Sequence, residues 1–271
     1  MRDITIFSGS AHPELAREVC DFLGVRLSGV DVRRFSNDCL YVQLLESCRE
    51  SDVFLIQPLV PPVQEHLFEL LLMLDVARGS SAFRTTAVIP HYAYARSDKK
   101  DAPRISIAGR LVADLLQTAG ANRVLTMTLH SPQVHGFFNV PVDHLNALTV
   151  LARYFREKQA LDNTIVVSPD LGNAKTAATL ARLLKTPVAA GSKRRLSDDR
   201  VIIDTIVGDV EGKDVIVLDD EIATGGTLIE LFDRLRDRGA RRISVACTHG
   251  LFTGKAIARL GARADLDEIV T

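Results

Sequence analysis

The sequence has little of what marks several large classes of protein. Its 271 residues include four cysteines and no tryptophan, and 33 basic and 34 acidic side chains leave a net charge of −1. The cysteines form no C-x-x-C pair, so neither a disulfide framework nor a zinc site is expected, and a reducing cytoplasm is favoured. The balanced charge gives no reason to expect nucleic acid or an anionic membrane as a partner.

The chain also lacks a long hydrophobic run. Its densest apolar stretch, residues 70–74, is far too short to cross a bilayer. The N-terminus enters an apolar segment directly, without the architecture of a signal peptide. The overall composition, with 46% hydrophobic and 25% charged residues, is that of an ordinary soluble protein. A cytoplasmic protein without membrane contacts is predicted.

Strand-like and helical segments alternate along the whole chain. Short β-branched runs predict strands, and longer segments with helical periodicity predict helices. The expected strands are residues 4–7, 53–57, 85–90, 124–129, 165–168, 215–218 and 243–247. The expected helices are residues 15–23, 63–77, 107–117, 150–156, 174–184 and 228–236. This alternation predicts an α/β fold with mainly parallel sheets flanked by helices.

A weak internal repeat indicates two α/β halves. Residues 120–124, GANRV, recur as residues 239–243, GARRI, and the strand after each copy is followed by His130 or His249. The length of the chain also suggests about two domains. The boundary is expected in the polar, proline-containing connection near residues 141–147, which gives domains 1–145 and 146–271.

The most informative segment is VIVLDDEIATGGT at residues 215–227. An apolar strand leads into Asp219 and Asp220, then into the small-residue loop 224–227 and a helical segment. Free N–H groups and the dipole at the start of a helix attract an anion, while the two carboxylates can accept hydroxyl protons. The combination fits a ribose 5-phosphate group. The simpler alternative is an ordinary turn beside solvated acids, because a short glycine-rich loop alone is weak evidence.

Polar residues also follow two other predicted strands, where ligands of α/β sheets gather. His130 follows one strand and Asp170 follows another. A histidine and a carboxylate over a phosphate suggest a divalent cation, and the oxygen-rich setting favours Mg²⁺ over zinc. Taken singly, His130 fits a satisfied residue at a strand end, and Asp170 fits a helix N-cap.

The basic segment GSKRRLSDDR, residues 191–200, mixes charge with glycine and serine and has no clear periodicity. It is expected to be a mobile loop. One interpretation is a solvated run of charges. The other is a lid that brings lysine and arginine over a phosphoryl group in transfer, where neutralising charge lowers the barrier.

Together these motifs resemble the ribose-phosphate pyrophosphokinases, or phosphoribosyl pyrophosphate synthetases. The similarity runs nearly end to end and includes RRFSN at 33–37, RSDKK at 96–100, HSPQVHGFF at 130–138 and KRR at 193–195. The resemblance implies two phosphoribosyltransferase-like domains. It also implies transfer of the β,γ-diphosphoryl group of Mg-ATP to the anomeric hydroxyl of ribose 5-phosphate, which releases AMP.

The resemblance further assigns roles to single residues. Lys193 and Arg195 are catalytic, and His130 and Asp170 hold Mg²⁺. The ribose 5-phosphate site consists of Asp219, Asp220, Ala223, Thr224, Gly225, Gly226 and Thr227. The ATP site consists of Phe35, Asn37, Cys39, Arg96, Ser97 and Lys99. Because the first two of these reach the adenine of a neighbouring subunit, a homo-oligomer is expected, at least a dimer and up to a hexamer.

Three positions depart from the family pattern. Thr128 stands where aspartate is common, Ala223 where a third acid is frequent, and Cys39 where an adenine-contacting glutamate is often found. They motivate an alternative, a weak or inactive paralogue that binds nucleotide and regulates an active synthetase. A nucleobase phosphoribosyltransferase is a third hypothesis, but it leaves segments 35–37 and 96–100 unexplained.

Overall fold

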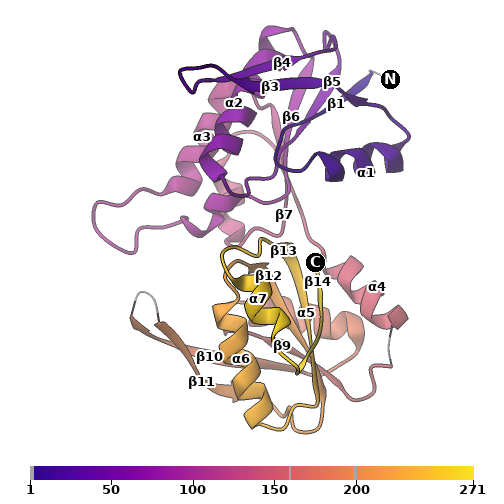
Figure 1. The fold of residues 1–271 in the computed structure, drawn as a ribbon, viewed down its shortest axis with the longest axis vertical. Coiled ribbons are helices and arrows are strands. Elements are labelled where there is room, and N and C mark those ends of the chain that lie inside the picture. The colour runs from indigo at the N-terminus through magenta and orange to yellow at the C-terminus, as the bar shows by residue number, and fades with distance from the viewer. Residues whose placement is uncertain (1–2, 159, 198–199) are drawn as a thin grey trace. The chain divides into compact units, whose positions relative to one another are not determined.

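The computed structural model describes residues 3–158, 160–197 and 200–271, and for residues 193–197 and 200–204 it describes the backbone alone. The chain divides into two compact units, Met1–Leu145 and Asn146–Thr271. Each unit contains a six-stranded sheet with helices on both faces (Figure 1). The predicted α/β class with mainly parallel sheets is confirmed.

The sheet of the first unit is wholly parallel and has the order β2-β1-β5-β6-β7-β8. Its strands are β1 (Ile4–Ser8), β2 (Leu27–Ser28), β5 (Asp52–Ile56), β6 (Arg84–Ile89), β7 (Arg123–Met127) and β8 (Val142–Leu145). The helices are α1 (Pro13–Leu23), α2 (Val63–Gly79) and α3 (Ala108–Ala119), with 3-10 turns η1 (Ala93–Arg96) and η2 (Pro132–Phe137).

Helix α2 shows how the first unit is held together. Leu70, Met73, Leu74 and Ala77 recur at helical spacing and are fully buried against the sheet, together with residues of α3. A leucine-to-alanine change at such a position typically costs about 2–5 kcal/mol. The opposite face of the sheet is covered by α1, so the strands are buried on both sides.

A separate antiparallel hairpin consists of β3 (Val30–Arg34) and β4 (Leu40–Leu44). The apolar side chains of Val30, Val42 and Leu44 pack onto the main core. The residues between the two strands form an exposed turn. Neither strand is among the predicted elements, because polar side chains interrupt both of them.

The second unit has the strand order β11-β10-β9-β12-β13-β14. Its strands are β9 (Thr164–Ser168), β10 (Val188–Ser197), β11 (Arg200–Val207), β12 (Asp214–Ile222), β13 (Arg242–Gly250) and β14 (Leu266–Val270). Its helices are α4 (Leu148–Lys158), α5 (Ala174–Leu184), α6 (Gly226–Asp237) and α7 (Ala256–Gly261). Only the pairing of β10 with β11 is antiparallel among the described strands of this sheet.

Strand β9 lies at the centre of this unit and is buried along its whole length. Val166 packs towards α4 and α5, whereas Val167 packs towards α6. This explains why a short continuous apolar run predicts a strand here: both of its faces are covered by helices.

Two predictions about this unit are wrong. Residues 191–197 do not form an irregular loop, because β10 continues to Ser197 and pairs with β11, whose β-branched residues favour a strand. Residues 198–199 of the predicted loop lie outside the described residues. Strand β12 does not end before the acid pair but continues to Ile222, because β13 still pairs with it there.

Candidate ribose 5-phosphate and nucleotide sites

The connection from β12 to α6 has the backbone of an anion site. Helix α6 begins at Gly226, and its N-cap Gly225 has φ of 73°, in the left-handed region that favours glycine. A β-carbon at Gly225 would also approach the Leu260 side chain to 3.2 Å. Because the N-cap residue is a glycine, it has no side chain to bond the amides of the first turn, and these amides suit an anionic acceptor.

The acid pair, Asp219 and Asp220, lies on β12, two residues before the strand ends at Ile222. Pairing of β12 with β9 ends at Val217, whereas pairing with β13 places Asp219 opposite Cys247. Asp219 and Asp220 are half-buried, and the Asp220 amide donates to Asp219 Oδ1 at 3.0 Å. The two carboxylates therefore lie beyond the end of β9, next to the start of α6.

The thiol of Cys247 lies on β13, in register with Asp219. Its side chain is fully buried, and burial, reinforced by the nearby Asp219 carboxylate, raises its pKa far above the ordinary range. A thiol held neutral in this way binds metal poorly. Beside the acid pair, the Cys247 thiol is therefore a poorer metal ligand than the carboxylates.

Asp170 follows β9, the strand next to β12 in the sheet. Its Oδ1 accepts from the Asn173 amide at 3.0 Å, and the Asn173 side chain donates to the Leu218 carbonyl at 3.1 Å. The structure thus brings the Asp170 turn to the strand that carries the acid pair. Asn173, rather than Asp170, occupies the N-cap position of α5.

His130 follows β7 in the first unit and is exposed. Thr128, two residues earlier, has φ of 43°, a conformation that is costly for a β-branched residue. The Thr128 amide donates to Leu145 at 2.8 Å. In the described ranges, no three His, Cys, Asp or Glu side chains are placed to hold a metal ion, so the assignment of His130 and Asp170 to Mg²⁺ stays a prediction.

The turn of the β3–β4 hairpin brings together Phe35, Asn37 and Cys39. The Phe35 amide donates to the Cys39 carbonyl at 2.9 Å, and the Cys39 amide donates to Asn37 Oδ1 at 3.2 Å. The Phe35 ring is about half exposed and meets Tyr41 edge-on, with 5.6 Å between ring centroids. An exposed, braced aromatic ring is suited to stacking against a flat base.

The other residues assigned to the ATP site by the resemblance lie at the end of η1 and in the segment between η1 and α3. Arg96 ends η1 and is exposed, as is Lys99. The Ser97 hydroxyl accepts from the Ala108 amide at 3.2 Å and lies 3.3 Å from the Ser106 carbonyl, to which it donates. Ser97 therefore fixes the start of α3 relative to Arg96.

Lys193 and Arg195 lie on β10, in register with Ile203 and Val201 of β11. Their side chains fall outside the part of the chain that is described. The backbone places both on an antiparallel hairpin at the edge of the sheet, and their catalytic assignment stays a prediction.

Comparison with known proteins identifies the family. The N-terminal domain of ribose phosphate pyrophosphokinase matches residues 4–120, and the phosphoribosyl synthetase-associated domain matches residues 199–271. A Deinococcus radiodurans ribose-phosphate pyrophosphokinase is 53% identical over 96% of this chain and 81% of its own length. The chain belongs to the ribose-phosphate pyrophosphokinase family.

Other relatives agree with this membership. A Clostridium acetobutylicum ribose-phosphate pyrophosphokinase is 45% identical over 99% of this chain and 84% of its own length. The crystal structure of phosphoribosylpyrophosphate synthetase from Mycobacterium smegmatis superimposes with a TM-score of 0.92 and 40% identity. The superposition covers 99% of this chain and 88% of the Mycobacterium smegmatis chain. The predicted family and its α/β fold class are confirmed, and none of these comparisons favours the inactive alternative.

The sequence interpretation missed two side chains that contact the residues of the Phe35–Cys39 turn, Arg34 and Tyr41. Arg34 contacts both the turn and α2, and Tyr41 contacts Phe35. The alternation of residues in 30–34 and 40–44 around a polar turn was the available signal for a hairpin. It does not reveal which charged residue of α2 faces the hairpin.

Proposed function

We propose that this ribose-phosphate pyrophosphokinase family member transfers the β,γ-diphosphoryl group of Mg-ATP to the anomeric hydroxyl of ribose 5-phosphate. The products are phosphoribosyl diphosphate and AMP. The observation that carries the proposal is the start of α6, with its glycine N-cap, on the loop that follows the acid-bearing end of β12. That arrangement supplies amide donors for a phosphate and carboxylate acceptors for the sugar hydroxyls.

In this proposal residues 146–271 form the domain that binds the sugar phosphate. The loop Ala223, Thr224, Gly225, Gly226 and Thr227 surrounds the 5-phosphate. Asp219 and Asp220 accept hydrogen bonds from the ribose hydroxyls. Fixing the sugar at both ends orients the anomeric hydroxyl for attack on the β-phosphorus, and such positioning supplies much of the rate in phosphoryl transfer.

Residues 1–145 form the domain that contacts ATP. Phe35 and Asn37 recognise the adenine of a neighbouring subunit, and Cys39 belongs to the same turn. Arg96 and Lys99 contact the nucleotide, and Ser97 holds their segment through its bonds to the α3 start. This arrangement requires a homo-oligomer, at least a dimer and up to a hexamer.

Lys193 and Arg195 act on the diphosphoryl group during transfer. As the bond to AMP breaks, negative charge redistributes over the phosphoryl oxygens and the leaving oxygen. Arginine offers a planar fork of donors and lysine a compact positive charge. Cations aimed at this developing charge lower the barrier more than they strengthen substrate binding.

The donors available to a metal fit Mg²⁺. Asp170 and the β12 carboxylates are oxygen ligands, and Cys247 is a buried neutral thiol. Mg²⁺ is commonly held by one or two carboxylates together with substrate phosphates, so a complete protein cage is not needed. His130 and Asp170 are the residues proposed to hold it. When bound, the ion neutralises phosphate charge.

Thr128 and Cys39 lie outside the sugar-phosphate loop, and Ala223 leaves the Thr224–Thr227 segment of that loop intact. No nucleic acid or membrane is proposed as a partner. In the described ranges no helix has the length and apolar character to cross a bilayer.

The test is AMP formation by the purified protein with Mg-ATP, with and without ribose 5-phosphate. AMP production that depends on ribose 5-phosphate supports the proposal. Nucleotide binding without turnover would support the regulatory paralogue instead, and release of diphosphate that depends on a nucleobase would support a phosphoribosyltransferase.

A further inference from the structure

The β3–β4 hairpin is attached to the first unit in two different ways. Near its base, Val30, Val42 and Leu44 pack onto the apolar core. Near its tip, the outward-facing Arg33 stacks on Tyr41, with 4.3 Å from the guanidinium carbon to the ring centroid. Arg34, the next residue, is directed towards α2 instead. The tip is thus held by charge where the base is held by apolar packing.

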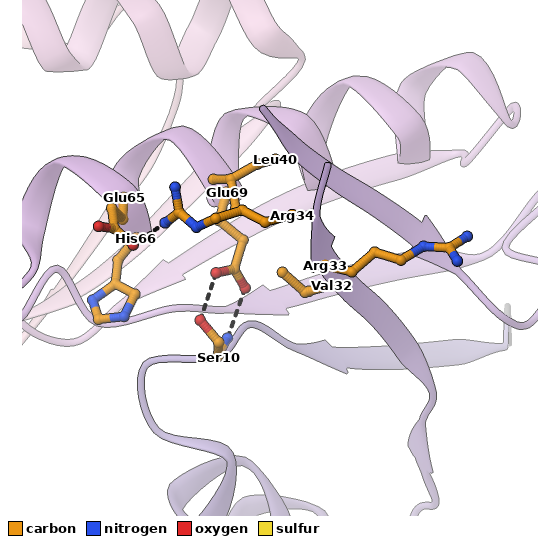
Figure 2. A pocket seen from close by; sticks show the side chains of 8 residues that line it. All are labelled: Ser10, Val32, Arg33, Arg34, Leu40, Glu65, His66 and Glu69. Carbon is orange, nitrogen blue, oxygen red and sulfur yellow. Dashed lines mark hydrogen bonds and ion pairs between the residues drawn. The ribbon is translucent and has the colours of Figure 1, made fainter. Parts of the chain in front are cut away.

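Arg34 joins the turn of the hairpin to α2. Its Nη1 atom donates to Asp38 Oδ1 at 2.7 Å and to the Asp38 carbonyl at 3.3 Å. Its Nη2 atom donates to a carboxylate oxygen of Glu65, in the first turn of α2 (Figure 2). Asp38 has φ of 69°, so Arg34 holds the residue at which the turn reverses in the left-handed region.

The space beneath the tip makes this ionic contact important. A pocket of about 250 Å³ lies there and is lined in part by Arg34, Glu65 and Glu69 (Figure 2). The buried Glu69 is already engaged, because it accepts from the amide of Ser10 at 2.7 Å and from its hydroxyl at 2.5 Å. Glu65 is the α2 carboxylate that binds Arg34 beside this pocket, which Val32 and Leu40 of the hairpin also line.

We propose that Arg34 is a positioning residue for the nucleotide, because it fixes the Phe35–Cys39 turn against Glu65 of α2. The inference rests on the proposed function, in which Phe35 and Asn37 of this turn contact adenine. A turn released from α2 samples more conformations, and ordering it again on binding reduces affinity. Loss of Arg34 therefore weakens ATP binding, while ribose 5-phosphate binding in the other unit is unaffected.

The Arg34–Glu65 ion pair should affect the position of the turn more than the stability of the fold. The Arg34 side chain is 38% exposed and that of Glu65 is 51% exposed, and such surface pairs add little to stability. The Arg34→Ala variant should consequently fold with an unchanged melting temperature. Arg34→Lys keeps the charge but loses the two-branched donor that reaches both partners, so it should retain only part of the function.

The experiment compares Arg34→Ala, Arg34→Lys, Glu65→Ala and the Arg34→Ala/Glu65→Ala double variant. Arg26→Ala is the matched control, because Arg26 forms a surface ion pair of 3.0 Å with Glu46 in the same unit. We expect about a tenfold higher KM for ATP in Arg34→Ala, with kcat and the KM for ribose 5-phosphate little changed. The double variant should be no worse than Arg34→Ala alone, because both changes break one contact.

An unchanged KM for ATP in folded Arg34→Ala, or an equal rise in Arg26→Ala, would overturn the proposal. If Arg34→Ala does not fold, the same comparison is made with Arg34→Lys and Glu65→Ala. If the wild-type protein makes no AMP, the proposed function fails separately. In that case, binding of a non-hydrolysable ATP analogue is measured for the wild type and the variants. Weaker binding by the Arg34 variants than by the wild type supports the positioning role. Equal binding by the wild type and the variants, or no binding by any of them, overturns it.

Discussion

The Nε2 atom of His144 accepts a hydrogen bond of 2.9 Å from the backbone amide of Leu129. This bond joins β8 to the segment that follows β7 and leads into His130. An acceptor nitrogen cannot carry a proton, so the bond requires neutral His144. Partial burial of the ring lowers the pKa of His144, and the nearby His135 lowers it further.

The first prediction concerns the pH dependence of stability. A histidine whose pKa is lower in the folded state contributes stability above its unfolded pKa of about 6.5, and this contribution is lost as the pH falls below that value. His144→Gln keeps a hydrogen-bond acceptor that does not titrate. Between pH 7.5 and pH 5.5, the free energy of unfolding should therefore fall less in His144→Gln than in the wild type. Equal slopes in chemical denaturation would contradict this role.

The second prediction concerns the stability of the protein at a lower pH. Asp214, at the start of β12, accepts from Arg241 Nε at 2.8 Å and from Arg242 Nη2 at 2.9 Å. These bonds to Arg242 and Arg241 lower the pKa of the buried Asp214 carboxyl to about 2. The stabilisation is present above the unfolded value of about 4 and is lost as the pH falls towards 2.

Asp214→Asn should lower the free energy of unfolding at pH 7 by about 1–2 kcal/mol, since both arginines are partly exposed and solvent screens the pair. Its stability should also change less than that of the wild type between pH 4 and pH 2. Urea unfolding at these pH values makes the measurement. Asp209→Asn, which removes an exposed pair with Lys213 in the same unit, is the control and should cost less.

The third prediction concerns Lys193 on β10. If its charge acts mainly in the transition state, Lys193→Ala should reduce kcat by about 10²–10³-fold. The dissociation constants of ribose 5-phosphate and of an ATP analogue should change little. A loss confined to substrate affinity, with kcat preserved, would be inconsistent with a catalytic role.

The fourth prediction concerns the sugar hydroxyls. Asp220→Asn replaces a charged acceptor, and hydrogen bonds to charged groups contribute about 1.5–3 kcal/mol. Ribose 5-phosphate affinity should therefore fall roughly tenfold or more. Calorimetric titration with ribose 5-phosphate measures this, and affinity for an ATP analogue serves as the internal control. Unaltered ribose 5-phosphate affinity in a folded variant would remove Asp220 from the site.

The sequence predicted the parts of the fold that burial determines. Strand β9 is covered by helices on both faces, so it reads as a continuous apolar run with clear flanking turns. The two antiparallel hairpins were not predicted. Polar residues interrupt β3 and β4, and Lys193, Arg194 and Arg195 interrupt β10, so the local pattern did not predict either hairpin. Their pairing depends on tertiary context rather than on local periodicity.

In the candidate site, too, one part could be predicted from the sequence and another could not. The Gly225 turn and the start of α6 could be predicted because backbone chemistry alone makes an anion site there. The contact between Arg34 and Glu65 could not be predicted, because the two residues are 31 positions apart in the sequence. Many other charged surface residues have similar neighbours in the sequence. Local sequence specifies turns and helix ends, whereas the choice of ion-pair partner depends on how the hairpin packs onto α2.

The most direct test of the central claim follows the β-phosphorus of ATP. The protein is incubated with ribose 5-phosphate, magnesium and ATP labelled with ³²P at the β position. The label should appear in phosphoribosyl diphosphate in step with the formation of unlabelled AMP. Label that stays in ATP, or that appears only as free diphosphate without the sugar ester, would contradict diphosphoryl transfer by this protein.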